Sequence, residues 1–443
     1  MTKHNQQLKG KKVLFGTVPA DGHFNPLTGL AKHLQASGCD VRWYTSPLFT
    51  KKLEKLGIQH YPFVRALDVN QDNVNTIFPE RASIDDPGAK LDFDMIEFFA
   101  KRAPEYYEDL KEIYPSFPFD ILIADSLFTA TPFVKSGMNI PVLSIGIVPL
   151  AENSVDLAPY GMALPPATSE AEKAKYAELH ELMTAVVFKK STDTFDDMLN
   201  GYNIPHQRGF LFDLLIREAS LYLQIGTPSF EYERSDIGKN VRFVGALMAY
   251  SGEQTTPWFD ERLTKYKKVV LLTQGTVEKD INKLIIPTLD AFKDTDVLVV
   301  VATGNNQTAA LRARYPFDNI IVSDYIPFDE IMPYASVYVT NGGYGGTLLS
   351  IKHKLPMVAA GIHEGKSEVC ARIGYFNLGL NLATDTPTAE LVKDAVNKVL
   401  ADSSYKAHVS RLADEINIYN AIETSTGYVA QLIAAHAKSA VAQ

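Results

Sequence analysis

The stretch Asn341-Gly-Gly-Tyr-Gly-Gly-Thr-Leu-Leu349 decides how this chain is expected to fold. It follows the apolar run 336–340, which is typical of a buried parallel strand, and it leads into an apolar helical segment from Thr347. Four glycines within 342–346 leave bare backbone N–H groups near a helix N-terminus, an arrangement that binds phosphate without a metal. The alternative is a tight strand-to-helix turn that needs glycine only for steric reasons.

Short apolar runs alternate with helical patterns on both sides of this stretch. After the first run, for example, Leu27, Leu30, Ala31 and Leu34 form one helical stripe, and Gly38 ends it. The predicted strands lie at 13–18, 41–44, 58–63, 119–125, 142–148, 221–225 and 241–244, and then at 269–273, 297–302, 320–322, 337–339 and 357–360. The alternation predicts an α/β fold of two facing, doubly wound, Rossmann-like domains with a cleft between them.

The length of 443 residues is too great for one compact core and indicates two domains. The polar stretch 249–256, followed by Pro257, is typical of a linker. We therefore expect an N-terminal domain over 1–248, a linker over 249–262 and a C-terminal domain over 263–425. A final helix over 426–443 is expected to pack back on the N-terminal domain.

Composition argues against several classes of binding partner and several cellular locations. The chain has 43 basic and 52 acidic residues, a formal charge of −9, which argues against binding nucleic acid or an anionic membrane. Its two cysteines, Cys39 and Cys370, predict neither a disulfide framework nor a zinc site. The start of the chain lacks an apolar signal core, and no apolar run reaches the ~18 residues of a membrane span. We expect a cytoplasmic protein.

A base and an orienting acid are predicted in the first half. His23 follows the first strand and precedes a helix that Asn25 and Pro26 are expected to open. Ligands bind at the carboxyl ends of parallel strands, and the positive end of a helix keeps an imidazole neutral and able to accept a proton. Asp125 ends a strand on the same rim and would hold the ring N–H. The alternatives are a structural histidine and an aspartate that caps the next helix.

In the second half, Gln274-Gly-Thr276 also lies between a strand and a helix and predicts a second contact to phosphate. Tyr325 follows another strand and is suited to stack on a nucleobase, although a buried aromatic residue is the alternative. The triplets 92–94 and 294–296 contain the two carboxylates of a metal motif but fall in helical or turn contexts. Gly16 and Gly22 have the wrong spacing for a dinucleotide-binding loop. Neither a metal nor another cofactor is expected.

Together these motifs make the chain resemble the family 1 glycosyltransferases of the GT-B fold, close to the bacterial macrolide and flavonoid glycosyltransferases, over nearly its whole length. The segment 22–26 is similar to the family's Gly-His-x-x-Pro motif, which implies that His23 is the catalytic base. The segment 119–125 is similar to the strand that carries the orienting acid, which implies that role for Asp125. The segments 274–276 and 325–328 resemble the phosphate-contacting turn and the base-stacking turn.

Two positions depart from the family pattern. The strand before the glycines normally ends in His, whereas here it ends in Asn341, which donates hydrogen bonds but carries no charge. The Asp-Gln pair that grips sugar hydroxyls aligns with Gly365 and Lys366, next to Glu364. The resemblance therefore leaves the donor open between UDP-glucose and dTDP-rhamnose, a carrier of a 6-deoxy sugar.

The resemblance implies an inverting, metal-independent transfer of a sugar to a hydroxyl of a small, largely apolar acceptor such as a flavonoid, another phenolic compound or a polyketide. The implied donor-binding residues are Gly275, Thr276, Tyr325, Ile326, Asn341, Gly342, Gly343, Gly345, Gly346, Thr347, Glu364, Gly365 and Lys366, and the implied acceptor-binding residues are Phe24, Phe93 and Phe128. The alternatives are a sugar-nucleotide epimerase and a degenerate, nucleotide-sugar-binding activator protein. The pair His23 and Asp125 argues against both.

Overall fold

The computed structural model describes residues 7–70, 72–252, 258–275, 278–363 and 365–441. It contains two sheets in which all strands pair in parallel. The first sheet consists of β1 (Lys12–Gly16), β2 (Asp40–Thr45), β3 (Gln59–Pro62), β4 (Ile121–Asp125), β5 (Val142–Gly146), β6 (Leu221–Gln224) and β7 (Val241–Phe243). The second consists of β8 (Lys268–Thr273), β9 (Val297–Ala302), β10 (Ile320–Ser323), β11 (Val337–Thr340), β12 (Met357–Ala359) and β13 (Gly379–Asn381).

Helices connect the strands and cover the sheets. Those of the N-terminal half are α2 (Asp21–Ala36), α3 (Thr50–Leu56), α4 (Val74–Ile77), α5 (Pro87–Asp94), α6 (Arg102–Ile113), α7 (Glu170–Leu182), α8 (Lys189–Gly201) and α9 (Leu211–Glu218). The remaining helices are α10 (Arg262–Lys265), α11 (Ile285–Phe292), α12 (Thr308–Arg314), α13 (Phe328–Ile331), α14 (Tyr344–Lys352), α15 (Lys366–Tyr375), α16 (Ala389–Ala401), α17 (Ser403–Ile418) and α18 (Ala421–Val441).

Each sheet has one point where the order of its strands reverses. The orders are β3-β2-β1-β4-β5-β6-β7 and β10-β9-β8-β11-β12-β13, so the reversals lie between β1 and β4 and between β8 and β11. The loops that leave the carboxyl ends of two such strands run to opposite faces of the sheet, which opens a crevice for a ligand. The predicted doubly wound fold is confirmed, with one reversal point in each half.

The hydrophobic core explains why the apolar runs form strands. Every residue of β4 and β9 is buried, as expected for a parallel sheet with helices on both faces. The predicted stripe of α2 is also confirmed, because Leu27, Leu30 and Leu34 are fully buried.

The prediction for the start of α2 was wrong. The helix begins at Asp21, with Ala20 at the N-cap position, and Pro26 lies inside it. The negative charge of Asp21 in the first turn is favourable at this end of the helix.

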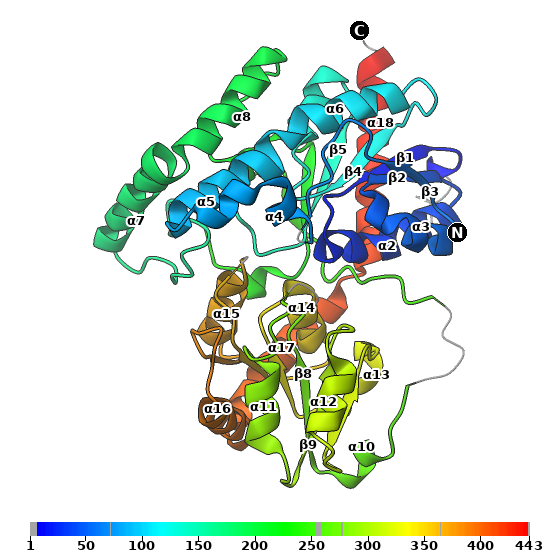
Figure 1. Ribbon diagram of the computed structural model, residues 1–443. Coiled ribbons are helices and arrows are strands. Elements are labelled where there is room, and N and C mark those ends of the chain that lie inside the picture. Colours follow the sequence, from blue (N-terminus) through cyan, green and yellow to red (C-terminus); the bar gives the residue numbers. More distant parts are fainter. Residues whose placement is uncertain (1–6, 71, 253–257, 276–277, 364, 442–443) are drawn as a thin grey trace.

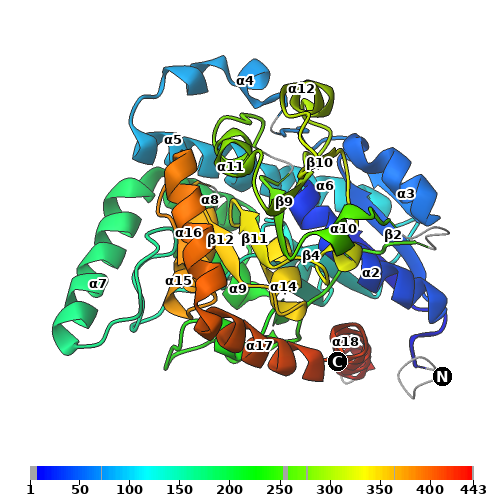
Figure 2. The same cartoon turned by 90° about the horizontal axis from the view of Figure 1, so that it is seen from below.

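The two halves lie one above the other in Figure 1, and β7 is the last strand of the upper half. The chain returns to the upper half after α17, where α18 packs against α2 and β4. Viewed from below, α17 runs across the lower half toward α18 (Figure 2). Among the described residues, no helix has both the length and the apolar character needed to cross a membrane.

Candidate active site

His23 and Asp125 meet at the reversal point of the first sheet. The Nδ1 atom of His23 lies 2.8 Å from Oδ1 of Asp125, the last residue of β4. The carboxylate also accepts hydrogen bonds from the backbone N–H groups of Val18, at 2.9 Å, and Leu127, at 2.8 Å. In a neutral imidazole, a hydrogen bond to an ionised carboxylate places the proton on Nδ1 and leaves Nε2 with a lone pair. This ring is therefore set up to accept a proton at Nε2.

The two members of this pair differ in their exposure to solvent. The Asp125 side chain is fully buried, whereas 15% of the His23 side chain is exposed. His23 belongs to the first turn of α2, rather than to a loop before the helix as predicted. The positive end of the helix dipole still acts on the ring from this position.

The glycine-rich turn lies at the reversal point of the second sheet. It follows β11, and α14 begins at Tyr344, three residues earlier than predicted, with Gly343 at the N-cap position. A Cβ atom added at Gly343 or Gly345 would meet nothing within 4 Å. The first N–H groups of a helix have no partner inside the helix, so this turn offers donors that have no partner among the described residues, beside open space.

The carboxyl edge of the first sheet faces this turn. Ile225 directly follows β6 and accepts a hydrogen bond of 2.9 Å from the hydroxyl of Tyr344, the first residue of α14. His23 and Asp125 lie at the same carboxyl edge, because all strands of the sheet are parallel. His23, the predicted base, therefore lies at the edge of the first sheet that faces the amides at the start of α14.

Asn341 connects the ends of β8 and β11. Its side-chain amide donates a hydrogen bond to the carbonyl of Gln274, so one of its two N–H groups is already used. The Gln274 side chain in turn accepts from the backbone of Leu284 and Ile285, at 3.3 Å each, and thereby caps α11. Gly275 is exposed beside Asn341, with its φ angle at 75°.

Several predicted contacts are contradicted by burial. The Phe24 ring packs in the core between Trp43 and Phe49, and the fully buried Phe128 ring stacks on Tyr106 at 4.9 Å. Neither ring can contact an acceptor from this position. The composition of the sequence indicates aromatic content, but it does not indicate which rings the core uses.

The predicted donor contact of the Thr347 hydroxyl is also contradicted, since this group is buried and donates back to the Gly343 carbonyl at 3.0 Å. The side chain of Ile326 is also part of the core, at 6% exposure, which leaves only its backbone for a ligand. The neighbouring Tyr325 is 71% exposed and presents a free ring, as base stacking would require. Phe93 on α5 is half-buried and lies edge to face with Phe78. Thr276 and Glu364 lie outside the described residues.

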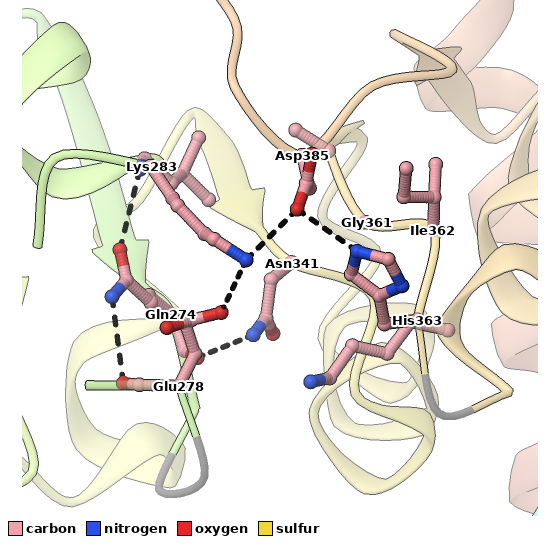
Figure 3. A pocket seen from close by; sticks show the side chains of 11 residues that line it. Gln274, Glu278, Lys283, Asn341, Gly361, Ile362, His363 and Asp385 are labelled. Atoms are coloured by element: carbon pink, nitrogen blue, oxygen red, sulfur yellow. Dashed lines mark hydrogen bonds and ion pairs between the residues drawn. The ribbon is translucent and has the colours of Figure 1, made fainter. Parts of the chain in front are cut away.

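A pocket that is open to solvent and lined mostly by polar and charged residues lies beside Asn341 (Figure 3). Lys283 lies at its centre, with Nζ 2.9 Å from Oε2 of Glu278 and 2.9 Å from Oδ2 of Asp385, which also lies 3.2 Å from Nε2 of His363. The hydrogen bond from Lys283 lowers the pKa of Asp385, and the same bonds raise the pKa of Lys283. Lys366 also lines this pocket. Such alternating charges suit a ligand rich in hydroxyl and phosphate oxygens.

Sequence reasoning missed the charged residues of this pocket. Asp385 lies shortly after β13, a strand that was not predicted, and the rule that sites follow strand ends would have found it. Lys283 and Glu278 belong to an irregular segment before α11, and no pattern marks them.

Gly365, at the N-cap of α15, is approached by a residue of the other half. Its φ angle is 75°, and a Cβ atom at this position would lie 3.0 Å from the Tyr160 hydroxyl oxygen. The Glu368 carboxylate holds the tyrosine's loop in place, because it accepts from the N–H groups of Gly161 and Ala163 at 2.8 Å each. A side chain larger than that of glycine would therefore displace Tyr160.

The chain is similar to known proteins over nearly its whole length. Residues 287–426 match the model of the erythromycin biosynthesis protein CIII-like C-terminal domain. The chain is 33% identical to 4'-demethylrebeccamycin synthase of Lentzea aerocolonigenes over 426 residues, which cover 96% of this chain and all of that one. It is 31% identical to UDP-glucosyltransferase 1 of Beauveria bassiana over 431 residues, 90% of this chain and 91% of that protein. The solved glycotransferase of kitacinnamycin has a TM-score of 0.75 at 18% identity and covers 96% of this chain and 100% of its own.

Proposed function

Because this chain belongs to the family 1 glycosyltransferases, enzymes of the GT-B fold, we propose that it moves a hexose or 6-deoxyhexose from a nucleoside diphosphate to a hydroxyl of a small acceptor. One observation carries this proposal. A histidine held by a buried aspartate lies at the reversal point of one sheet, and unpaired helix amides lie at the reversal point of the other. The histidine suits an acceptor hydroxyl, and the helix amides suit a diphosphate.

In the proposed mechanism, Nε2 of His23 removes the proton from the acceptor hydroxyl. Asp125 stabilises the imidazolium that forms, through the 2.8 Å hydrogen bond to Nδ1. The acceptor oxygen attacks the anomeric carbon from the side opposite the diphosphate, so its configuration inverts. The N–H groups of Tyr344, Gly345 and Gly346 in the first turn of α14 meet the negative charge that develops on the leaving diphosphate.

We propose that neither a metal nor another cofactor takes part, because the helix N-terminus already supplies positive potential to the diphosphate. Over the described part of the chain, no three His, Cys, Asp or Glu side chains gather in a way that could hold a metal ion. The triplet 92–94 has structural partners instead. Asp92 accepts a hydrogen bond of 3.0 Å from the N–H of Ser191, and Asp94 forms an ion pair with Arg81.

For the acceptor, we propose a flavonoid, another phenolic compound or a polyketide. The half-buried rings of Phe78, Phe93 and Phe98 pack together in the N-terminal half and offer apolar surface. Relatives named for rebeccamycin, erythromycin and kitacinnamycin support a natural-product acceptor. Cys39 and Cys370 are both free and buried, which fits the cytoplasmic location that we propose.

For the donor, Gly365 supports a sugar that lacks one hydroxyl. The family resemblance implies a carboxylate at this position, and losing its hydrogen bonds removes ~1.5–3 kcal/mol of binding, or roughly 10- to 100-fold in affinity. Several relatives are named UDP-glucosyltransferase, which supports UDP-glucose as the other candidate donor. We propose that the enzyme accepts dTDP-rhamnose at least as well as UDP-glucose.

Nucleotide release tests the proposed function. Each donor is incubated with and without a phenolic acceptor, and each mixture is repeated with a chelator. We expect release only with the acceptor, no loss on chelation, and kcat/KM for dTDP-rhamnose no lower than for UDP-glucose. Release without the acceptor would favour a hydrolase, and conversion of the donor to its epimer without release would favour an epimerase. Nucleotide-induced thermal stabilisation with neither reaction would favour an activator protein. A loss on chelation that magnesium or manganese restores would contradict metal independence, and a strong preference for UDP-glucose would overturn the deoxy-sugar donor.

A further inference from the structure

Tyr344 lies in the middle of the glycine-rich turn, but its side chain belongs to the other half of the molecule. The residue is 8% exposed, and its ring stacks on Phe230 with 6.2 Å between ring centroids and 12° between ring planes. Its hydroxyl donates to the Ile225 carbonyl at 2.9 Å and lies 3.4 Å from Nε2 of Gln224. Burial raises the pKa of this hydroxyl, which keeps it protonated and able to donate.

The receiving surface fits the phenol closely. Gly226 has a φ angle of 98°, and a Cβ atom there would lie only 2.9 Å from the Tyr344 hydroxyl oxygen. The Gln224 side chain is fully buried, and its amide also donates to the carbonyls of Val148, at 2.8 Å, and Ile225, at 3.0 Å. Tyr344 is therefore held by a fixed group of backbone and side-chain atoms rather than by mobile surface side chains.

This contact connects the two reacting centres through the first sheet. Gln224 is the register partner of Gly146 on β5, and the preceding residue of β5, Ile145, is the register partner of Asp125. Asp125 in turn holds His23. The hydroxyl of Tyr344 thus links the turn that offers amides to a diphosphate with the same sheet that carries the base.

We propose that Tyr344 is a positioning residue, which fixes the distance between the bound diphosphate and His23; this inference rests on the proposed function. The proposed diphosphate contacts are the backbone N–H groups of Tyr344, Gly345 and Gly346, which belong to the C-terminal half, so nucleotide affinity does not depend on the Tyr344 hydroxyl. The transfer step needs both halves in register, and even a small misplacement of reacting groups is costly to the rate.

A separate buried ion pair keeps the halves together when this hydroxyl is removed. Nε of Arg372 on α15 lies 2.9 Å from Oε1 of Glu231, the residue after Phe230. The same guanidinium lies 2.8 Å from Oε2 of Glu368 and over the Tyr232 ring at 4.1 Å. Tyr344→Phe, which also keeps the ring stack, is therefore expected to fold with the halves docked.

The test compares Tyr344→Phe with Tyr338→Phe, a matched loss of one buried hydroxyl on β11 that stays within the C-terminal half. For Tyr344→Phe we expect kcat to fall roughly 5- to 20-fold, with the Kd for UDP or dTDP changed less than about twofold. Tyr338→Phe should leave both constants near the wild-type values. An unchanged kcat, or a kcat that falls only together with nucleotide affinity, would overturn the proposal.

Hydrogen exchange measured by mass spectrometry gives a readout that does not depend on catalysis. Tyr344→Phe should speed exchange in both 225–230 and 343–349, which belong to different halves, whereas Tyr338→Phe should affect at most the second segment. Exchange that is unchanged in 225–230 would contradict the link between the halves. If the wild-type protein transfers no sugar, the proposed function fails, and the exchange result still decides whether Tyr344 couples the two halves.

Discussion

Replacing His23 with alanine is expected to lower the rate of sugar transfer by ~10²-fold or more while nucleotide affinity stays nearly unchanged. In the proposed mechanism the imidazole removes the acceptor proton, and Nδ1 of the ring lies 2.8 Å from Oδ1 of Asp125. The proposed diphosphate site lies in the other half, at the first turn of α14, so nucleotide affinity should not depend on this ring. Steady-state kinetics and calorimetry with UDP or dTDP measure the two quantities separately.

The matched control is His33→Ala, which removes a histidine from the last turn of the same helix. His33 lies 3.5 Å from Glu423, away from the proposed site, so this variant should keep its transfer rate. Near-normal turnover in His23→Ala would remove His23 from the mechanism. A large loss in both variants would point to damage of α2 rather than to the loss of a base.

Replacing Gly345 with valine is expected to abolish detectable binding of the nucleoside diphosphate. A Cβ atom at this position meets nothing within 4 Å, so the protein itself has room for the side chain. That room is the space through which a diphosphate would approach the amides of α14, and a valine would fill it. Gly343→Val should act in the same way, for the same reason. Calorimetry with UDP and dTDP on the folded variants measures the effect.

Two other glycines show how to interpret this result. Gly201 ends α8 and is equally open, so Gly201→Val is the control for placing a valine on an exposed helical position. Gly342 is unsuitable as a test, because its φ angle is 86° and a Cβ atom there would lie 2.5 Å from Sγ of Cys370. Unaltered nucleotide affinity in a folded Gly345→Val protein would rule out this turn as the diphosphate site.

The strands could be predicted because parallel sheets bury continuous apolar runs. Even β9, with six buried residues, is visible as one run in the sequence. The strand β13 was missed because its three residues, Gly379–Asn381, are too few and only partly apolar. The start of α14 was placed too late because glycine has a low helix propensity, which tertiary contacts of Tyr344 override here.

The candidate site could be predicted only where a residue follows a strand. His23 and the glycines follow strands, and Asp125 ends one. Their placement at the reversal points of the two sheets could therefore be predicted. The bond between Tyr344 and Ile225 spans 119 residues and joins two halves, and no local pattern encodes it. The burial of Phe24 and Phe128 likewise depends on how strands and helices pack, which residue type alone does not specify.

The anomeric configuration of the product tests the central claim most directly. The acceptor glycoside formed from a donor of known configuration is isolated, and NMR spectroscopy determines the configuration of the new bond. A single displacement driven by His23 predicts a glycoside whose anomeric configuration is opposite to that of the donor. A product with retained configuration would contradict the account.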